Sequence, residues 1–155
     1  MRRPPGEVLD PKIKSLNYLN LVLAKMEAKS SGADEALLLD MQGRVSEATG
    51  CNIFLRHAER LSTPRTGILV GITRATVLDL AKELGYAAEE TDLQLYDAYT
   101  ADEILICSTA GGLLPITGID GRIVGDGKPG PVFASLRDAY NAMIESPLHG
   151  TPVFE

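Results

Sequence analysis

The chain has 155 residues, of which 45% are hydrophobic and 23% are charged, and this is the composition of one ordinary globular domain. Fifteen Lys and Arg against 21 Asp and Glu give a formal net charge of −6, which argues against nucleic acid or an anionic membrane as a partner. Cys51 and Cys107 lack C-x-x-C or Cys/His spacing, so a metal site and a disulfide framework have no support. We expect two buried free thiols.

The sequence shows no pattern typical of a membrane-spanning segment or of a secretion signal. No apolar run approaches the roughly 18 residues of a membrane span, and the start MRRPPGEVLD lacks the apolar core of a signal peptide. We therefore expect a soluble cytoplasmic protein.

Three segments have the apolar spacing of helices that pack one face against a core. The first covers residues 16–31 and is followed by Gly32, a typical residue after a helix C-terminus. The second covers residues 73–84 and is followed by Gly85. The third begins at Pro131, because proline is favoured in the first turn of a helix.

The remaining apolar segments predict strands. Residues 35–64 contain EALLLD, VSEATGCNIFLRH and RLSTP, which indicate short strands joined by tight turns, one of them at residues 42–43. Residues 101–109 form a continuous apolar run typical of a strand buried on both faces, and Asp120-Gly121 predicts a β-hairpin. Strands and helices interleave without repeats or a linker, which predicts one α/β domain.

Two charged residues could do chemistry, although each has an ordinary structural explanation. Lys14 precedes the first predicted helix, and a lysine amine is a usable nucleophile only when burial or a neighbouring cation lowers its pKa. Most lysines are instead solvated surface charges. Glu47 ends a short strand beside small residues, where an exposed turn charge is the ordinary interpretation.

Two small-residue segments could bind an anion. Gly71, Ile72 and Thr73 open the second helix, where backbone N–H groups and a hydroxyl suit a phosphate, although a plain helix cap has the same pattern. The turn CSTAGG at residues 107–112 follows a buried strand, so its Thr109 and Ala110 can offer donors to an anionic group. Tight packing against a neighbour is the alternative for this turn.

Taken in order, the motifs KSLNYLN, SEATGCNIF, LVGITR, ADEILICSTAGGLLPI, IDGR and GDGKPGP resemble the class IV, or fold-type IV, pyridoxal-phosphate aminotransferases. The resemblance runs from about Lys12 to Tyr140. This family contains branched-chain amino acid, D-amino acid and (R)-amine transaminases together with aminodeoxychorismate lyase.

The resemblance implies the large C-terminal domain of the D-amino acid aminotransferase-like fold. This is an α/β domain with a mixed, partly barrel-like sheet and about three main helices. Residues 1–155 would form a single cofactor-binding domain, with residues 1–11 and 146–155 peripheral. The smaller N-terminal domain of the family would be absent, because the chain begins about where that domain ends.

The cofactor implied by the resemblance is pyridoxal 5′-phosphate (PLP). By resemblance, Lys14 forms the Schiff base with PLP and shuttles a proton, and Glu47 keeps the pyridine nitrogen protonated. Tyr18 would face the phenolic oxygen. The remaining residues by resemblance contact the phosphate or, for the last two, also the substrate carboxylate: Gly71, Ile72, Thr73, Thr109 and Ala110.

The implied reaction moves an amino group from an amino acid, of the branched-chain type by preference, to a 2-oxo acid. The family also implies a homodimer. Two enzyme alternatives use the same Lys14 and Glu47, namely an aminodeoxychorismate lyase-like activity and an (R)-amine transaminase activity. A third alternative is a non-catalytic cofactor-binding or assembly module, since the small domain is missing.

Overall fold

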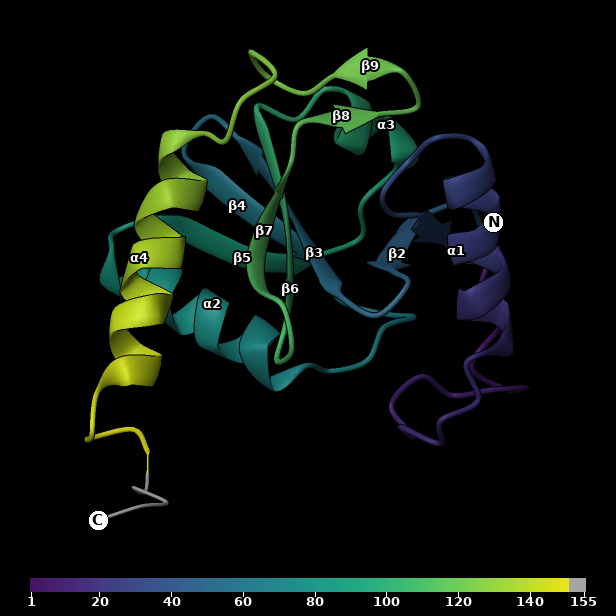
Figure 1. Ribbon diagram of the computed structural model, residues 1–155, viewed down its shortest axis with the longest axis horizontal. Coiled ribbons are helices and arrows are strands. Elements are labelled where there is room, and N and C mark those ends of the chain that lie inside the picture. The colour runs from purple at the N-terminus through teal and green to yellow at the C-terminus, as the bar shows by residue number, and fades with distance from the viewer. Residues whose placement is uncertain (151–155) are drawn as a thin grey trace.

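The computed structural model describes residues 1–150, so the last five residues of the segment expected to be peripheral, 151–155, lie outside the described part of the chain. Within residues 1–150, four helices and nine strands follow one another as Figure 1 shows. Their order is α1 (Leu19–Ser30), β1 (Leu37–Leu39), β2 (Val45–Ala48), β3 (Asn52–His57), β4 (Arg60–Pro64), α2 (Ile72–Glu83), β5 (Ala87–Thr91), α3 (Leu95–Tyr99), β6 (Glu103–Ser108), β7 (Gly112–Ile116), β8 (Gly118–Ile119), β9 (Arg122–Ile123) and α4 (Pro131–Glu145).

A five-stranded sheet with the order β5-β4-β3-β6-β7 forms the centre of the molecule. The β4–β5 pair is parallel and the other three pairs are antiparallel, which confirms the expected α/β class with a mixed sheet. The pairs β1–β2 and β8–β9 form separate two-stranded sheets. The strands of residues 1–150 therefore do not close into a barrel.

Two apolar cores lie on opposite faces of the central sheet. One contains Phe54 and Leu105 together with side chains of α2 and α4, which cover this face in Figure 1. The other contains Leu55, Ile104 and Ile106 and lies on the side of β1 and β2. Side chains alternate between the two faces along a strand, so β6 contributes apolar residues to both cores. This explains its continuous apolar run and confirms the prediction of a strand buried on both faces.

The predicted helices are confirmed, with one change at a boundary. Helix α1 begins at Leu19 rather than at residue 16, because Leu16 has a φ of 64° in the left-handed region, which a right-handed helix excludes. Helices α2 and α4 begin within one residue of the predicted starts. Two elements were not predicted: α3, which spans only five residues, and β5, a polar edge strand with no apolar run.

The hairpin predicted at Asp120-Gly121 is confirmed as the turn between β8 and β9. Asp120 and Gly121 both have positive φ, 49° and 74°, as the favoured two-residue hairpin turn requires. No helix in residues 1–150 is both long enough and apolar enough to cross a lipid bilayer.

The two thiols differ in exposure. Cys107 lies in the core beneath α2 and α4, and burial raises its pKa to about 12. Cys51 is only half-buried, so the prediction of two buried thiols is wrong for this residue. It immediately precedes Asn52, the first residue of the central strand β3, and so lies at the end of that strand.

We expect a thiol reagent such as iodoacetamide at pH 8.5 to modify Cys51 in the folded chain and to leave Cys107 unmodified. The thiolate is the reacting species, and burial both hides Cys107 and opposes its ionisation. Mass spectrometry before and after denaturation in urea measures the modification, with Cys51→Ser as the control. Equal modification of both thiols in the folded chain would contradict this packing.

The N-terminus of α4 depends on the buried carboxylate of Glu103, which accepts hydrogen bonds from the backbone N–H groups of Val132 and Phe133 at 3.2 and 2.9 Å. Arg56 pairs with the same carboxylate at 3.3 Å. A Cβ at residue 130 would lie 2.1 Å from Glu103 Cδ, so this contact also requires Gly130.

We expect Glu103→Gln to lower the free energy of unfolding by about 2 kcal/mol, because the amide loses the ion pair and turns an N–H toward a backbone donor. Urea denaturation followed by circular dichroism measures the change. Glu59→Gln alters an exposed carboxylate and serves as the control. Equal stability of both variants would contradict the role of Glu103.

Candidate active site

Three of the sequence-predicted residues, Lys14, Tyr18 and Glu47, line one cavity of about 110 Å³. The cavity lies between the irregular segment 9–18 and the residues around the β2–β3 turn. Segments far apart in the sequence therefore place an amine, a phenol and a carboxylate around one space.

The backbone before α1 brings Lys14 and Tyr18 to this cavity. Ser15 N–H donates to the Ile13 carbonyl at 2.6 Å, and Tyr18 N–H donates to the carbonyl of Leu16, the residue with the left-handed φ. These two tight turns delay the start of the helix. Tyr18 then takes the N-cap position of α1, where its carbonyl accepts a bond from Val22 N–H at 2.8 Å. Both side chains are exposed at the mouth of the cavity.

Glu47 is buried within β2, with only 5% of its surface exposed, so the exposed turn charge considered above is wrong. One carboxylate oxygen pairs with the guanidinium of Arg3. The other accepts the Leu69 N–H at 2.9 Å and the Asn52 side-chain N–H at 3.3 Å. These donors compensate for the burial of the charge and favour the ionised carboxylate.

Arg3 is a site residue that the sequence analysis missed. Residues 1–3 run parallel to β1, with the Arg3 N–H donating to the Leu39 carbonyl at 2.8 Å, and this pairing carries the Arg3 side chain to Glu47. Burial lowers the pKa of Arg3, but a guanidinium retains its proton even so. In the sequence, a basic pair followed by two prolines carries no signal of this contact.

The N-terminus of α2 offers unpaired backbone donors. Gly71 is the N-cap residue, and no side chain caps this end of the helix. The first hydrogen bond of the helix runs from the Ala75 N–H to the Gly71 carbonyl. The N–H groups of Ile72 and Thr73 therefore have no acceptor within the helix, and the helix dipole makes this end positive. Such an end binds anions.

The turn after β6 meets the start of α2. The hydroxyl oxygens of Thr73 and Thr109 lie 3.3 Å apart, which places a side chain of each segment at one point. Thr109 and Ala110 are both exposed, so this turn is not tightly packed against a neighbour. Ala110 lies in the same turn as Thr109 and adds no side-chain hydrogen-bonding group.

Strand pairing joins the cavity to the anion-binding groups. Asn52 lies opposite Cys107 in the β3–β6 pair, so Cys51 lies beside Ser108. Cys51 also lines the cavity that Lys14 lines, and Ser108, which lies beside it, is the residue before Thr109. The arrangement therefore runs from Lys14 and Glu47, past Cys51, to the hydroxyls of Thr73 and Thr109.

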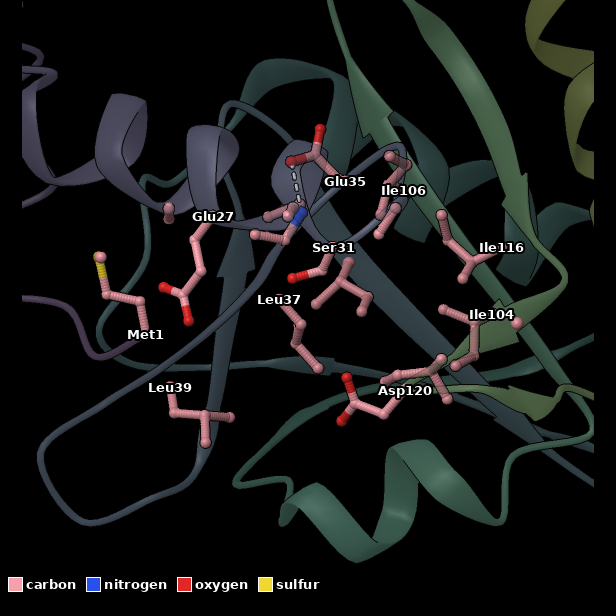
Figure 2. A pocket seen from close by; sticks show the side chains of 18 of the residues that line it. Met1, Glu27, Ser31, Glu35, Leu37, Leu39, Ile104, Ile106, Ile116 and Asp120 are labelled. Atoms are coloured by element: carbon pink, nitrogen blue, oxygen red, sulfur yellow. Dashed lines mark hydrogen bonds between the residues drawn. The ribbon is translucent and has the colours of Figure 1, made fainter.

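A larger cavity of about 310 Å³ lies between α1 and the second apolar core. Figure 2 shows Leu37, Ile104 and Ile106 around it, with the carboxylates of Glu27 and Asp120 also present. Among the described residues, none of the sequence-predicted site residues lines this cavity. No lysine or arginine is among the residues that line it, so we place the candidate site at the smaller cavity.

Comparisons with known proteins show the family to which the chain belongs. The family model Amino-transferase class IV matches residues 1–119. A protein of Methanocaldococcus jannaschii is 47% identical over 142 residues, which cover 90% of this chain and 49% of that protein. The branched-chain-amino-acid aminotransferase of Pseudomonas aeruginosa is 44% identical over 128 residues, which cover 82% of this chain and 42% of that protein.

A solved structure has the same fold. The branched-chain amino acid aminotransferase of Thermobaculum terrenum, solved in its PLP form, is similar with a TM-score of 0.90 and 41% sequence identity. The match covers 92% of this chain and 48% of that chain. This chain thus spans about half the length of the relatives that it matches. It belongs to the class IV aminotransferase family.

Proposed function

We propose that residues 1–155 form a single cofactor-binding domain of a PLP-dependent aminotransferase, which moves an amino group from a branched-chain amino acid to a 2-oxo acid. The main support for this proposal is the cavity that both Lys14 and the buried Glu47 line, together with the N-terminus of α2, which suits an anion. The Thermobaculum terrenum relative, whose structure is the PLP form, supports the same cofactor.

The residues of the site fit the three functional groups of PLP. An amine, Lys14, suits the aldehyde, and a buried carboxylate, Glu47, suits the pyridine nitrogen. A carboxylate has about four acceptor positions, and Glu47 uses three, for Arg3, Leu69 and Asn52. One position remains for a pyridinium N–H. The N-terminus of α2 suits the phosphate.

Lys14 has two tasks in this proposal. Its amine would hold PLP at the aldehyde carbon, and as a free base the same amine would take the proton from the substrate α carbon. When bound, PLP supplies an aromatic ring that accepts the negative charge left on that carbon. The exposed position of Lys14 at the mouth of the cavity leaves its amine free to reach the substrate.

Glu47 holds a proton on the pyridine nitrogen. Arg3 and two N–H donors keep its carboxylate negative, and a negative charge at this place favours the protonated ring. Tyr18 lies on the same cavity and would donate to the phenolic oxygen. Thus two polar groups orient the ring from separate elements.

The phosphate would be held by the N–H groups of Ile72 and Thr73 and by the hydroxyls of Thr73 and Thr109. Gly71, the N-cap residue of α2, has no side chain that could cover these donors. Thr109 and Ala110, exposed in the turn after β6, would also bind the substrate carboxylate. These donors need no reorganisation, because the helix end and the strand pair already hold them in place.

A homodimer is part of the proposal. Helix α1 buries Ala24 and Ala28, whereas Leu19, Val22 and Met26 are 67%, 49% and 62% exposed. A contiguous exposed apolar surface on a helix often marks a place where another protein binds. This exposed face supports contact with a second copy of the chain.

We expect borohydride to fix PLP to Lys14 when the purified chain is mixed with PLP and reduced. Peptide mass spectrometry locates the modification, and absorbance of the reduced pyridoxyl group measures its extent. Lys12→Ala is the matched control, because Lys12 is an exposed lysine two residues away. Lys14→Ala should remove the modification. Modification at other lysines to the same extent would contradict the proposal.

We expect Glu47→Gln to retain the modification at Lys14 but to slow exchange of the leucine α-hydrogen with D₂O by about 100-fold. An amide gives no negative charge to favour a protonated ring. Proton NMR of leucine measures the exchange, with Glu59→Gln as the control.

An unchanged exchange rate in Glu47→Gln would exclude its proposed role. Absence of exchange in the unaltered chain, with Lys14 modified, would instead favour the non-catalytic cofactor-binding module.

A further inference from the structure

Asn52, the first residue of β3, connects the two parts of the candidate site. Asn52 is 7% exposed, and its amide N–H groups donate to the Leu69 carbonyl at 2.8 Å and to the Glu47 carboxylate at 3.3 Å. Leu69 N–H donates at 2.9 Å to the same carboxylate oxygen of Glu47. Glu47, Asn52 and Leu69 therefore form a closed triangle of hydrogen bonds.

The other side of the Asn52 amide contacts the start of α2. A Cβ at residue 71 would lie 2.1 Å from Asn52 Oδ1 and 3.3 Å from its Cγ. Gly71 has an ordinary φ of −74° and ψ of 141°, so the backbone conformation there does not require glycine. The space filled by Asn52 requires it instead.

We propose that Asn52 is a positioning residue that holds the Glu47 carboxylate and the phosphate-binding residues 71–73 at a set separation. This inference rests on the proposed function, in which these two elements bind opposite ends of PLP. The amide links them through two short paths. One runs through Leu69, two residues before Gly71, and the other is direct contact with Gly71 itself.

The separation matters because the ring of PLP is rigid, which fixes the distance between its nitrogen and the ring carbon that carries the phosphate arm. A loop free to shift would bind one end at the expense of the other, and the cost of ordering it would reduce affinity. The buried amide removes this freedom before the cofactor binds. Its removal should therefore loosen residues 69–73 even in the chain without PLP.

The first test is amide hydrogen exchange of the PLP-free chain, measured by mass spectrometry. We expect Asn52→Ala to accelerate exchange in the peptide covering residues 69–73 about tenfold or more, while a peptide from α4 keeps its rate. Glu59→Ala, which alters an exposed side chain outside α4 and outside residues 69–73, is the control. Asn52→Ser, which keeps a short polar side chain, serves if the alanine variant does not fold.

The second test is the dissociation constant for PLP, followed by absorbance. We expect Asn52→Ala to raise it about tenfold or more, a loss equal to about 1.4 kcal/mol of binding free energy. Gly71→Ala should also weaken binding, because its methyl group collides with the Asn52 amide. The double variant Asn52→Ala/Gly71→Ala should bind PLP more tightly than Gly71→Ala alone, since the shorter side chain leaves space for the methyl group.

Two results would overturn the inference. One is unchanged exchange at residues 69–73 in both Asn52 variants, or equal acceleration in α4, which would mark a residue of general stability only. The other is a double variant that binds no better than Gly71→Ala. Failure of the unaltered chain to bind PLP would refute the proposed function instead, and the exchange measurement without PLP would still decide whether Asn52 holds this loop.

Discussion

The buried carboxylate of Glu47 is the constraint on which the rest of the site depends. A charge with 5% exposure is tolerated only when its partners replace the lost water, and its donors come from Arg3, Asn52 and the backbone of Leu69. These three residues belong to the start of the chain, to β3 and to the loop before α2. One side chain thus fixes three separate segments at one point.

The arrangement of the sheet extends this point into a site. Pairing of β3 with β6 places Asn52 opposite Cys107, so the turn that carries Thr109 lies next to the loop that begins α2. Arg74, buried in the first turn of α2, donates to the Pro64 carbonyl at 2.8 Å and anchors that helix at the end of β4. The donors for an anion are therefore fixed by the same elements that form the core.

Much of the fold could be predicted from the sequence, because its signals are local. Helices α2 and α4, the apolar strand β6 and the hairpin at Asp120-Gly121 each have a pattern that a short window contains. Helix α3 and strand β5 have no such pattern, since they are short or polar and depend on tertiary contacts. Similarly, no pattern in the sequence predicts the positive φ of Leu16, because of which α1 begins only at Leu19.

The site, too, could be predicted only in part from the sequence. Lys14 and Glu47 could be named from their motifs, but their partners could not. Arg3 and Asn52 meet Glu47 only through the folded backbone, and the reason for glycine at residue 71 is a contact with a side chain nineteen positions earlier.

A crystal structure of the chain grown with PLP would show whether Glu47 and the start of α2 bind the cofactor. We expect the pyridine nitrogen within hydrogen-bonding distance of Glu47, the phosphate at residues 71–73 and Thr109, and continuous electron density from Lys14 Nζ to the cofactor. A cofactor bound elsewhere, or bound here with its nitrogen turned away from Glu47, would contradict this proposal.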